Sequence, residues 1–178
     1  QGAGQSGRRM SAHGSPIDRI RAHASQLFKG GRLEEAANAY RNILEMSPSD
    51  FDAIHHLGVM AIMSGRLEEA RRLLQATLDL SPANPEVWQH YGMSLQHLNR
   101  TDEAVTAYER ALSLKPDYSD AVFCLGVTQK NAGRRDPALV AFNHFIAMRG
   151  SEYPALLHRG DLLREAGDLA GAMADYES

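Results

Sequence analysis

Three histidines and the only cysteine of this 178-residue chain recur at intervals of 34 residues, as His56, His90, Cys124 and His158. An imidazole donates or accepts hydrogen bonds, and a thiol does both weakly. If folding places these side chains next to one another, they form a row of polar groups that can bond the carbonyls and amides of a peptide. The alternative is a set of solvated or packing side chains, and the sequence favours neither interpretation.

The spacing of the reactive residues does not support a metal site or a catalytic site. A compact metal site would need a second histidine close to the row, such as His55 or His97, and the chain has no HExxH or paired-cysteine spacing. It also has no glycine-rich phosphate loop and no GxSxG sequence, and spacing identifies no acid or base partner for Cys124. We therefore expect no metal, no cofactor and no enzymatic activity.

The composition is that of an ordinary globular protein, with 43% hydrophobic and 23% charged residues. The formal net charge of −3 and the absence of a basic cluster argue against nucleic-acid binding. No apolar run approaches the roughly 18 residues needed to cross a membrane, and a single cysteine excludes an intrachain disulfide. We expect a cytoplasmic protein without membrane contact, in which residues 1–16 are a disordered tag or linker.

The 34-residue spacing extends to the whole chain. The string Gly-Arg-Leu-Glu-Glu-Ala occurs at 31–36 and again at 65–70, and related strings follow at 99–104, 133–138 and 167–172. In the first three copies a proline follows twelve residues after the alanine, as Pro48, Pro82 and Pro116. Such strict internal periodicity is typical of repeat proteins.

Each repeat is predicted to contain two helices, because apolar residues recur at three- and four-residue spacing on both sides of the central turn. The turn residue is one that tolerates a left-handed backbone, namely Gly31, Gly65, Asn99, Gly133 and Gly167. The prolines end the second helix, and Asp50, Asn84 and Ser119 are the expected N-caps of the next. Glycines at one place of four repeats, 58, 92, 126 and 160, predict close helix packing, since glycine within a helix costs about 1 kcal/mol.

The third repeat resembles the tetratricopeptide signature through Trp88, Tyr91, Gly92, Leu95, Ala104, Tyr108, Ala111 and Pro116. The resemblance implies an all-α fold, a right-handed α–α superhelix of helix-turn-helix units. The predicted domain spans 17–178, with repeats at 17–50, 51–84, 85–118, 119–152 and an incomplete one at 153–178. Because the fifth repeat lacks part of its second helix and no capping helix follows, we expect the chain to be a fragment of a longer protein.

The resemblance also implies where a partner binds, because the first helices of tetratricopeptide repeats line a concave groove. A peptide or partner protein is therefore expected to bind there, on a surface that is partly polar and partly apolar. The array is similar to the bacterial-type repeats that precede O-linked N-acetylglucosamine transferase-like enzymes, in which an asparagine row holds the substrate backbone. The groove residues predicted in this way are His55, His56, Val59, Met63, Gln89, His90, Met93, His97, Phe123, Cys124, Val127 and His158. The acidic residues Glu86 and Asp120 lie on the same groove-facing side of their helices.

Two alternatives to a free-standing interaction module stay open. In the first, the repeats are the substrate-recognition arm of a larger glycosyltransferase, sulfotransferase or hydroxylase whose catalytic domain is absent from this sequence. In the second, the uncapped apolar face of the C-terminal repeat pairs with another copy and produces a homo-oligomer.

Overall fold

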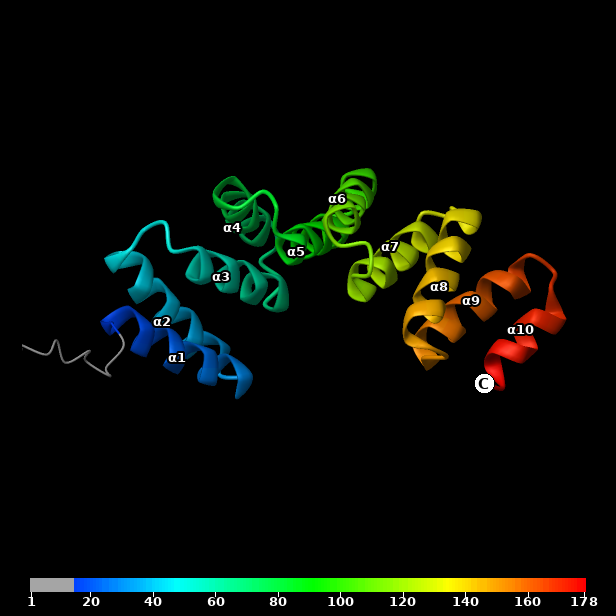
Figure 1. Ribbon diagram of the computed structural model, residues 1–178, viewed down its shortest axis with the longest axis horizontal. Helices are drawn as coiled ribbons and strands as arrows, with labels where there is room; N and C mark the ends of the chain where they lie inside the picture. The colour runs from blue at the N-terminus through cyan, green and yellow to red at the C-terminus, as the bar shows by residue number, and fades with distance from the viewer. Residues whose placement is uncertain (1–14) are drawn as a thin grey trace, which may run out of the picture. The chain divides into compact units, whose positions relative to one another are not determined.

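The computed structural model describes residues 15–178, and within this range the chain forms ten helices and no strand (Figure 1). Each pair of helices occupies one of the 34-residue units. The helices are α1 (Pro16–Lys29), α2 (Leu33–Met46), α3 (Phe51–Met63), α4 (Leu67–Leu80), α5 (Pro85–His97), α6 (Thr101–Leu114), α7 (Ser119–Asn131), α8 (Arg135–Arg149), α9 (Tyr153–Glu165) and α10 (Leu169–Tyr176).

The chain divides into two compact units, Gln1–His56 and Leu57–Ser178, with the boundary inside α3. In the described part of the first unit, α1 packs against α2. In the second unit, α5, α7 and α9 are the first helices of successive hairpins, and α5 contacts α7 while α7 contacts α9. Among the described residues, no helix combines the length and apolar character needed to span a membrane.

The first helix begins with a reciprocal cap at Ser15. The Ser15 hydroxyl accepts a hydrogen bond from the Asp18 amide at 3.1 Å, and the Asp18 carboxylate accepts one from the Ser15 amide at 3.0 Å. Pro16 is the first helical residue, where its missing N–H costs nothing. The predicted linker over 1–16 is therefore two residues too long. Residues 1–14, for which disorder was expected, lie outside the described part of the chain.

The turn between the two helices of each hairpin has the predicted left-handed residue. The φ angle is 59° at Asn99 and lies between 70° and 85° at the four equivalent glycines. The residue that follows donates its amide back to a carbonyl in the last turn of the first helix, as Arg100 does to Leu95 at 2.9 Å. This closes the helix end and reverses the chain.

Two of the three predicted N-caps are confirmed, and one is wrong. Asp50 accepts the Ala53 amide at 3.0 Å, and Asn84 accepts amides from the first turn of α5. Ser119, in contrast, is the first residue of α7, and the cap position belongs to Tyr118, which makes no capping side-chain bond. The prediction failed because Ser119 lies one residue out of phase with the other two caps.

The recurring glycines allow the close helix packing predicted from their spacing. A Cβ atom built on Gly92 would lie 2.7 Å from the Tyr108 ring, and one on Gly126 would lie 2.9 Å from the Phe142 ring. Both rings are fully buried. Each glycine on a first helix thus leaves room for the side chain sixteen residues later on the second helix.

A hydrogen-bond network joins the third repeat to the fourth. The Gln96 side-chain carbonyl accepts bonds from the Tyr108 hydroxyl at 2.8 Å and from the Thr128 hydroxyl at 2.9 Å. The Thr128 side chain is buried, and Tyr108 is fully enclosed. The shared acceptor therefore satisfies two buried donors from different hairpins and fixes how these hairpins stack.

Candidate functional site

Three members of the histidine and cysteine row, His56, Cys124 and His158, pack between repeats. His56 stacks on the Tyr40 ring with centroids 4.8 Å apart, and its Nδ1 atom lies 2.8 Å from the Asp52 carbonyl. His158 stacks on the Phe142 ring at 5.3 Å. In both cases the partner ring comes from the second helix of the preceding repeat, sixteen residues earlier. One face of each of these two imidazole rings thus packs against the preceding repeat, and only the ring edge can contact a ligand.

Cys124 occupies the same place in the fourth repeat, in contact with the Tyr108 hydroxyl. Its sulfur lies 3.7 Å from the Gln89 side-chain nitrogen. Burial raises the pKa of the Cys124 thiol, although the Gln89 amide and the neighbouring Tyr108 hydroxyl act in the opposite direction. Because the thiolate is the nucleophilic form, a raised pKa disfavours a nucleophilic role for Cys124.

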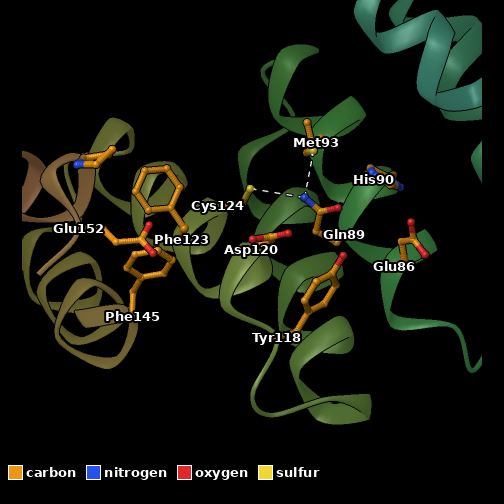
Figure 2. A pocket seen from close by; sticks show the side chains of 11 residues that line it. Glu86, Gln89, His90, Met93, Tyr118, Asp120, Phe123, Cys124, Phe145 and Glu152 are labelled. Atoms are coloured by element: carbon orange, nitrogen blue, oxygen red, sulfur yellow. Dashed lines mark hydrogen bonds between the residues drawn. The ribbon is translucent and has the colours of Figure 1, made fainter. Parts of the chain in front are cut away.

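The second unit contains a cleft of about 580 Å³ between its first helices (Figure 2). Side chains from α5 form one wall and side chains from α7 form the other, with further contributions from α8 and the start of α9. The cleft is lined by Glu86, Gln89, His90, Met93, Tyr118, Asp120, Phe123, Cys124, Phe145, Glu152 and Pro154. Its volume lies in the range of sites that bind small molecules or several peptide side chains.

An aromatic pair forms the apolar part of this cleft. The Phe123 and Phe145 rings lie 5.3 Å apart and are tilted against each other. Phe145 is buried, whereas Phe123 and Met93 are only half-buried. Figure 2 shows Phe123 and Phe145 together at one end, with Met93 and Cys124 towards the other. A ligand side chain placed here would cover apolar surface that is now in contact with water.

Three carboxylates line the cleft, at Glu86, Asp120 and Glu152. Their field acts on a neighbouring phenol: burial, together with the charges of Glu86 and Asp120, raises the pKa of Tyr118 to about 12. A raised tyrosine pKa means that a further negative charge is unfavourable at this point. The cleft therefore combines apolar side chains with negatively charged ones.

Five predicted site residues meet around this cleft, namely Gln89, His90, Met93, Phe123 and Cys124. Val59, Met63, His97 and Val127 are not among its lining residues, and Met63 and His97 are exposed. His158 lies outside the lining but contacts the Phe123 ring at 5.8 Å between centroids. His55 and His56 belong to the first unit.

The lining also includes Glu86 and Asp120, which lie at a predicted groove-facing place of their repeats, and four residues that the sequence-based prediction omitted: Tyr118, Phe145, Glu152 and Pro154. Phe145 could have been recognised from the sequence. It stands at a place where the third repeat has the small residue Ala111, so the bulky ring is a departure that calls for a reason. Tyr118 and Glu152 lie in the connections between repeats, where helical periodicity does not predict which way a side chain points.

A smaller cleft, of about 470 Å³, lies in the first unit and is lined by Asp18, Arg21, Ala22, Ser25, Tyr40, Asp52 and His56. Arg21 makes ion pairs with Asp50 at 2.7 Å and with Asp52 at 3.3 Å, so its charge is already neutralised. The Tyr40 hydroxyl is buried and has no hydrogen-bond partner among residues 15–178. In the second unit, the Glu86 carboxylate and a ring nitrogen of His90 lie within 4.8 Å of each other.

Paired helices that repeat in constant register, with a cleft between successive first helices, define a helical-repeat scaffold. The family models identify it further: a model described as "Tetratricopeptide repeat" matches residues 27–91, and one described as "TPR repeat" matches 97–133. The chain belongs to the tetratricopeptide repeat family. No curated protein sequence gives a significant match to the chain.

Solved structures with the same fold agree with this assignment. The structure of MamA is 21% identical, with a TM-score of 0.78 over 93% of this chain and 92% of that one. Pseudomonas aeruginosa PilF is 23% identical, with a TM-score of 0.82 over 90% of this chain and 73% of that one. YrrB, described as a TPR protein with an unusual peptide-binding site, is 22% identical, with a TM-score of 0.71 over 88% and 80%. The predicted all-α tetratricopeptide fold is thus confirmed.

Proposed function

We propose that this array is a protein-interaction module that holds a segment of a partner protein in the cleft between α5 and α7. The cleft itself carries the proposal, since it places half-buried apolar side chains and hydrogen-bonding groups on neighbouring first helices. An extended peptide needs this combination, because pockets give specificity while polar groups hold the backbone. The peptide-binding site attributed to YrrB, a protein of the same fold, supports the same use of the fold here.

The properties of the reactive residues favour a binding role for the array rather than a catalytic one. Tetratricopeptide folds are typically non-catalytic scaffolds, and the raised pKa of Cys124 disfavours the thiolate that a nucleophilic mechanism requires. The acidic side chains of the cleft and the net charge of −3 favour a polypeptide partner over a nucleic acid. A role as the recognition arm of an O-linked N-acetylglucosamine transferase-like enzyme would use the same cleft. A cytoplasmic location stays a prediction that rests on the single cysteine.

The test is a selection of phage-displayed random heptapeptides on the immobilised chain, followed by NMR titration of the ¹⁵N-labelled chain with a selected peptide. We expect shift changes at α5 and α7 residues, with little change along the outer face of α8. Met93→Glu places a charge in the cleft and should abolish binding. The matched control is Val140→Glu on α8, where the original side chain is 69% exposed. Loss of binding in both variants, or in neither, would contradict the proposed site.

Self-association is a second candidate, favoured by exposed apolar side chains on the last hairpin. Leu169 is 62% exposed, Met173 59% and Tyr176 42%. Tyr176 occupies the place at which Tyr40 and Tyr108 are fully buried. Light scattering over a concentration series tests this candidate, because a dimer formed through α10 should dissociate when Met173 is replaced by glutamate. A chain that stays monomeric at high concentration would exclude it.

A further inference from the structure

The eleven residues that line the cleft in the second unit carry an uneven distribution of charge. Three are carboxylates, at Glu86, Asp120 and Glu152, and none is lysine or arginine. Glu152 already has a cation, since the exposed Arg149 guanidinium lies 2.9 Å from its carboxylate. Asp120 has no ion pair with any residue in the range 15–178, and its side chain is exposed. The Glu86 carboxylate lies within 4.8 Å of a ring nitrogen of His90, one turn later on α5. The carboxylate without an ion pair is therefore Asp120, at the start of α7.

Tyr118 lies next to Glu86 and Asp120 in the cleft and already contacts a cation of the protein. The charges of Glu86 and Asp120 add to burial in raising the pKa of its phenol. The Lys115 ammonium group lies 5.0 Å from the centroid of the same ring, although Lys115 itself is exposed and does not line the cleft. Figure 2 shows Tyr118 between Glu86 and Asp120, with its hydroxyl directed towards Gln89. A cationic group of a ligand between Glu86 and Asp120 would be stabilised by these two carboxylates.

A buried amide next to these carboxylates is poorly satisfied by the protein. Gln89 is only 6% exposed, and its side-chain nitrogen bonds to two sulfur atoms, Met93 Sδ at 3.1 Å and Cys124 Sγ at 3.7 Å. Sulfur is a weak acceptor, whereas a peptide carbonyl is a strong one. The amide group of Gln89 would therefore form a stronger hydrogen bond with the backbone carbonyl of a ligand. Breaking its weak bonds to the two sulfur atoms costs little.

We infer that the cleft recognises a basic peptide, in which an arginine or lysine lies between Glu86 and Asp120 and a neighbouring apolar side chain packs on Phe123. This rests on the proposed peptide-binding function and adds the chemistry of the partner. Figure 2 shows Phe123 on one side of the cleft, Glu86 on the other, and Asp120 between them. The cation would thus lie next to the apolar side chain, in the middle of the cleft. In this arrangement Gln89, which Figure 2 shows between Asp120 and Glu86, lies beside the cation and donates to the backbone of the bound peptide.

The experiment uses the full chain and a peptide chosen from random heptapeptides displayed on phage, synthesised with a fluorescein label. Three versions are compared by fluorescence polarisation: the selected peptide, one with each arginine replaced by citrulline and lysine by norleucine, and one with each basic residue replaced by glutamate. Citrulline keeps the shape and most hydrogen bonds of arginine and removes its charge. Titrations at low and high salt separate the electrostatic contribution, which is screened at high ionic strength.

The protein variants are Glu86→Gln and Asp120→Asn, with Glu109→Gln as the matched control. Glu109 is exposed on α6 and does not line the cleft. We expect each cleft variant to bind the basic peptide about two- to fivefold more weakly, as for partly exposed ion pairs, and the control to bind unchanged. Asp120→Lys should improve binding of the glutamate peptide. Melting curves check that each variant folds.

The outcomes separate this inference from the proposed function. The inference would be overturned if the selected peptides lack basic residues, or if the basic and citrulline versions bind with equal affinity. In that case, loss of binding in Met93→Glu would still support the proposed peptide-binding function. If no heptapeptide is selected at all, the inference and the proposed function fail together. Enrichment of basic residues with the expected loss in both cleft variants supports both.

Discussion

Two tyrosines at the same place of different repeats should respond in opposite ways to loss of the hydroxyl group. Tyr108 and Tyr40 are both fully buried, but only Tyr108 has a strong acceptor, the Gln96 carbonyl at 2.8 Å. A buried hydrogen bond contributes about 0.5–1.5 kcal/mol net, so Tyr108→Phe should destabilise the chain by about that amount. Tyr40→Phe removes a buried hydroxyl that has no partner within residues 15–178, and should leave the stability unchanged or raise it by up to about 1 kcal/mol.

Urea and thermal unfolding, followed by circular dichroism, measure both effects. For a domain of this size a change of 1 kcal/mol moves Tm by about 2–4 °C, which separates the two variants clearly. Phenylalanine is sterically acceptable at this place, because the fourth repeat has Phe142 there, also fully buried. Equal losses in the two variants, or a larger loss for Tyr40→Phe, would refute the reasoning from hydrogen-bond satisfaction.

Three further predictions follow from packing and charge. Gly92→Ala should cost about 1–2 kcal/mol in a urea titration, because overpacking against the facing ring outweighs the better helix propensity of alanine; an equally stable variant would contradict the packing argument. Since the pKa of Tyr118 is raised above its unfolded value, stability should fall as pH rises from about 10 to about 12, and Asp120→Asn should lower this pKa in an ultraviolet titration; an unchanged midpoint would exclude the charge effect. Arg159→Ala should leave the buried Asp175 carboxylate unpaired and cost about 3–5 kcal/mol, seen as faster amide exchange in α10 but not in α5. Unchanged exchange in α10 would count against it.

The sequence predicted the features that depend on local backbone geometry. The left-handed position of Asn99, the cap at Asn84 and the glycine at 92 each follow from what one residue type allows. The N-cap of α7 was predicted wrongly at Ser119, because a serine caps a helix only when it lies directly before the first helical residue, and that position belongs to Tyr118. Local preference ranks residue types, whereas position relative to the helix start decides which one is used.

The candidate site was predictable only in part. Gln89 and Phe123 follow from their phase on the first helices, but Glu152 comes from a connection whose course depends on tertiary packing. The sequence also left two uses of the His56 side chain open, and the structure assigns its ring face to Tyr40. Contacts between side chains sixteen or more residues apart require the relative placement of helices, which periodicity alone does not provide.

Each residue of the histidine and cysteine row lies in one repeat, and the side chain sixteen residues before it lies in the preceding repeat. His158 and the Phe142 ring are an example. The repeats are therefore not interchangeable. Deleting residues 85–118 would bring a leucine, Leu74, into the place that Tyr108 now holds beside Cys124, and the hydroxyl that contacts the sulfur would be lost. Any lengthening or shortening of such an array must transfer these partners as a pair, so the natural unit of exchange runs from the middle of one hairpin to the middle of the next.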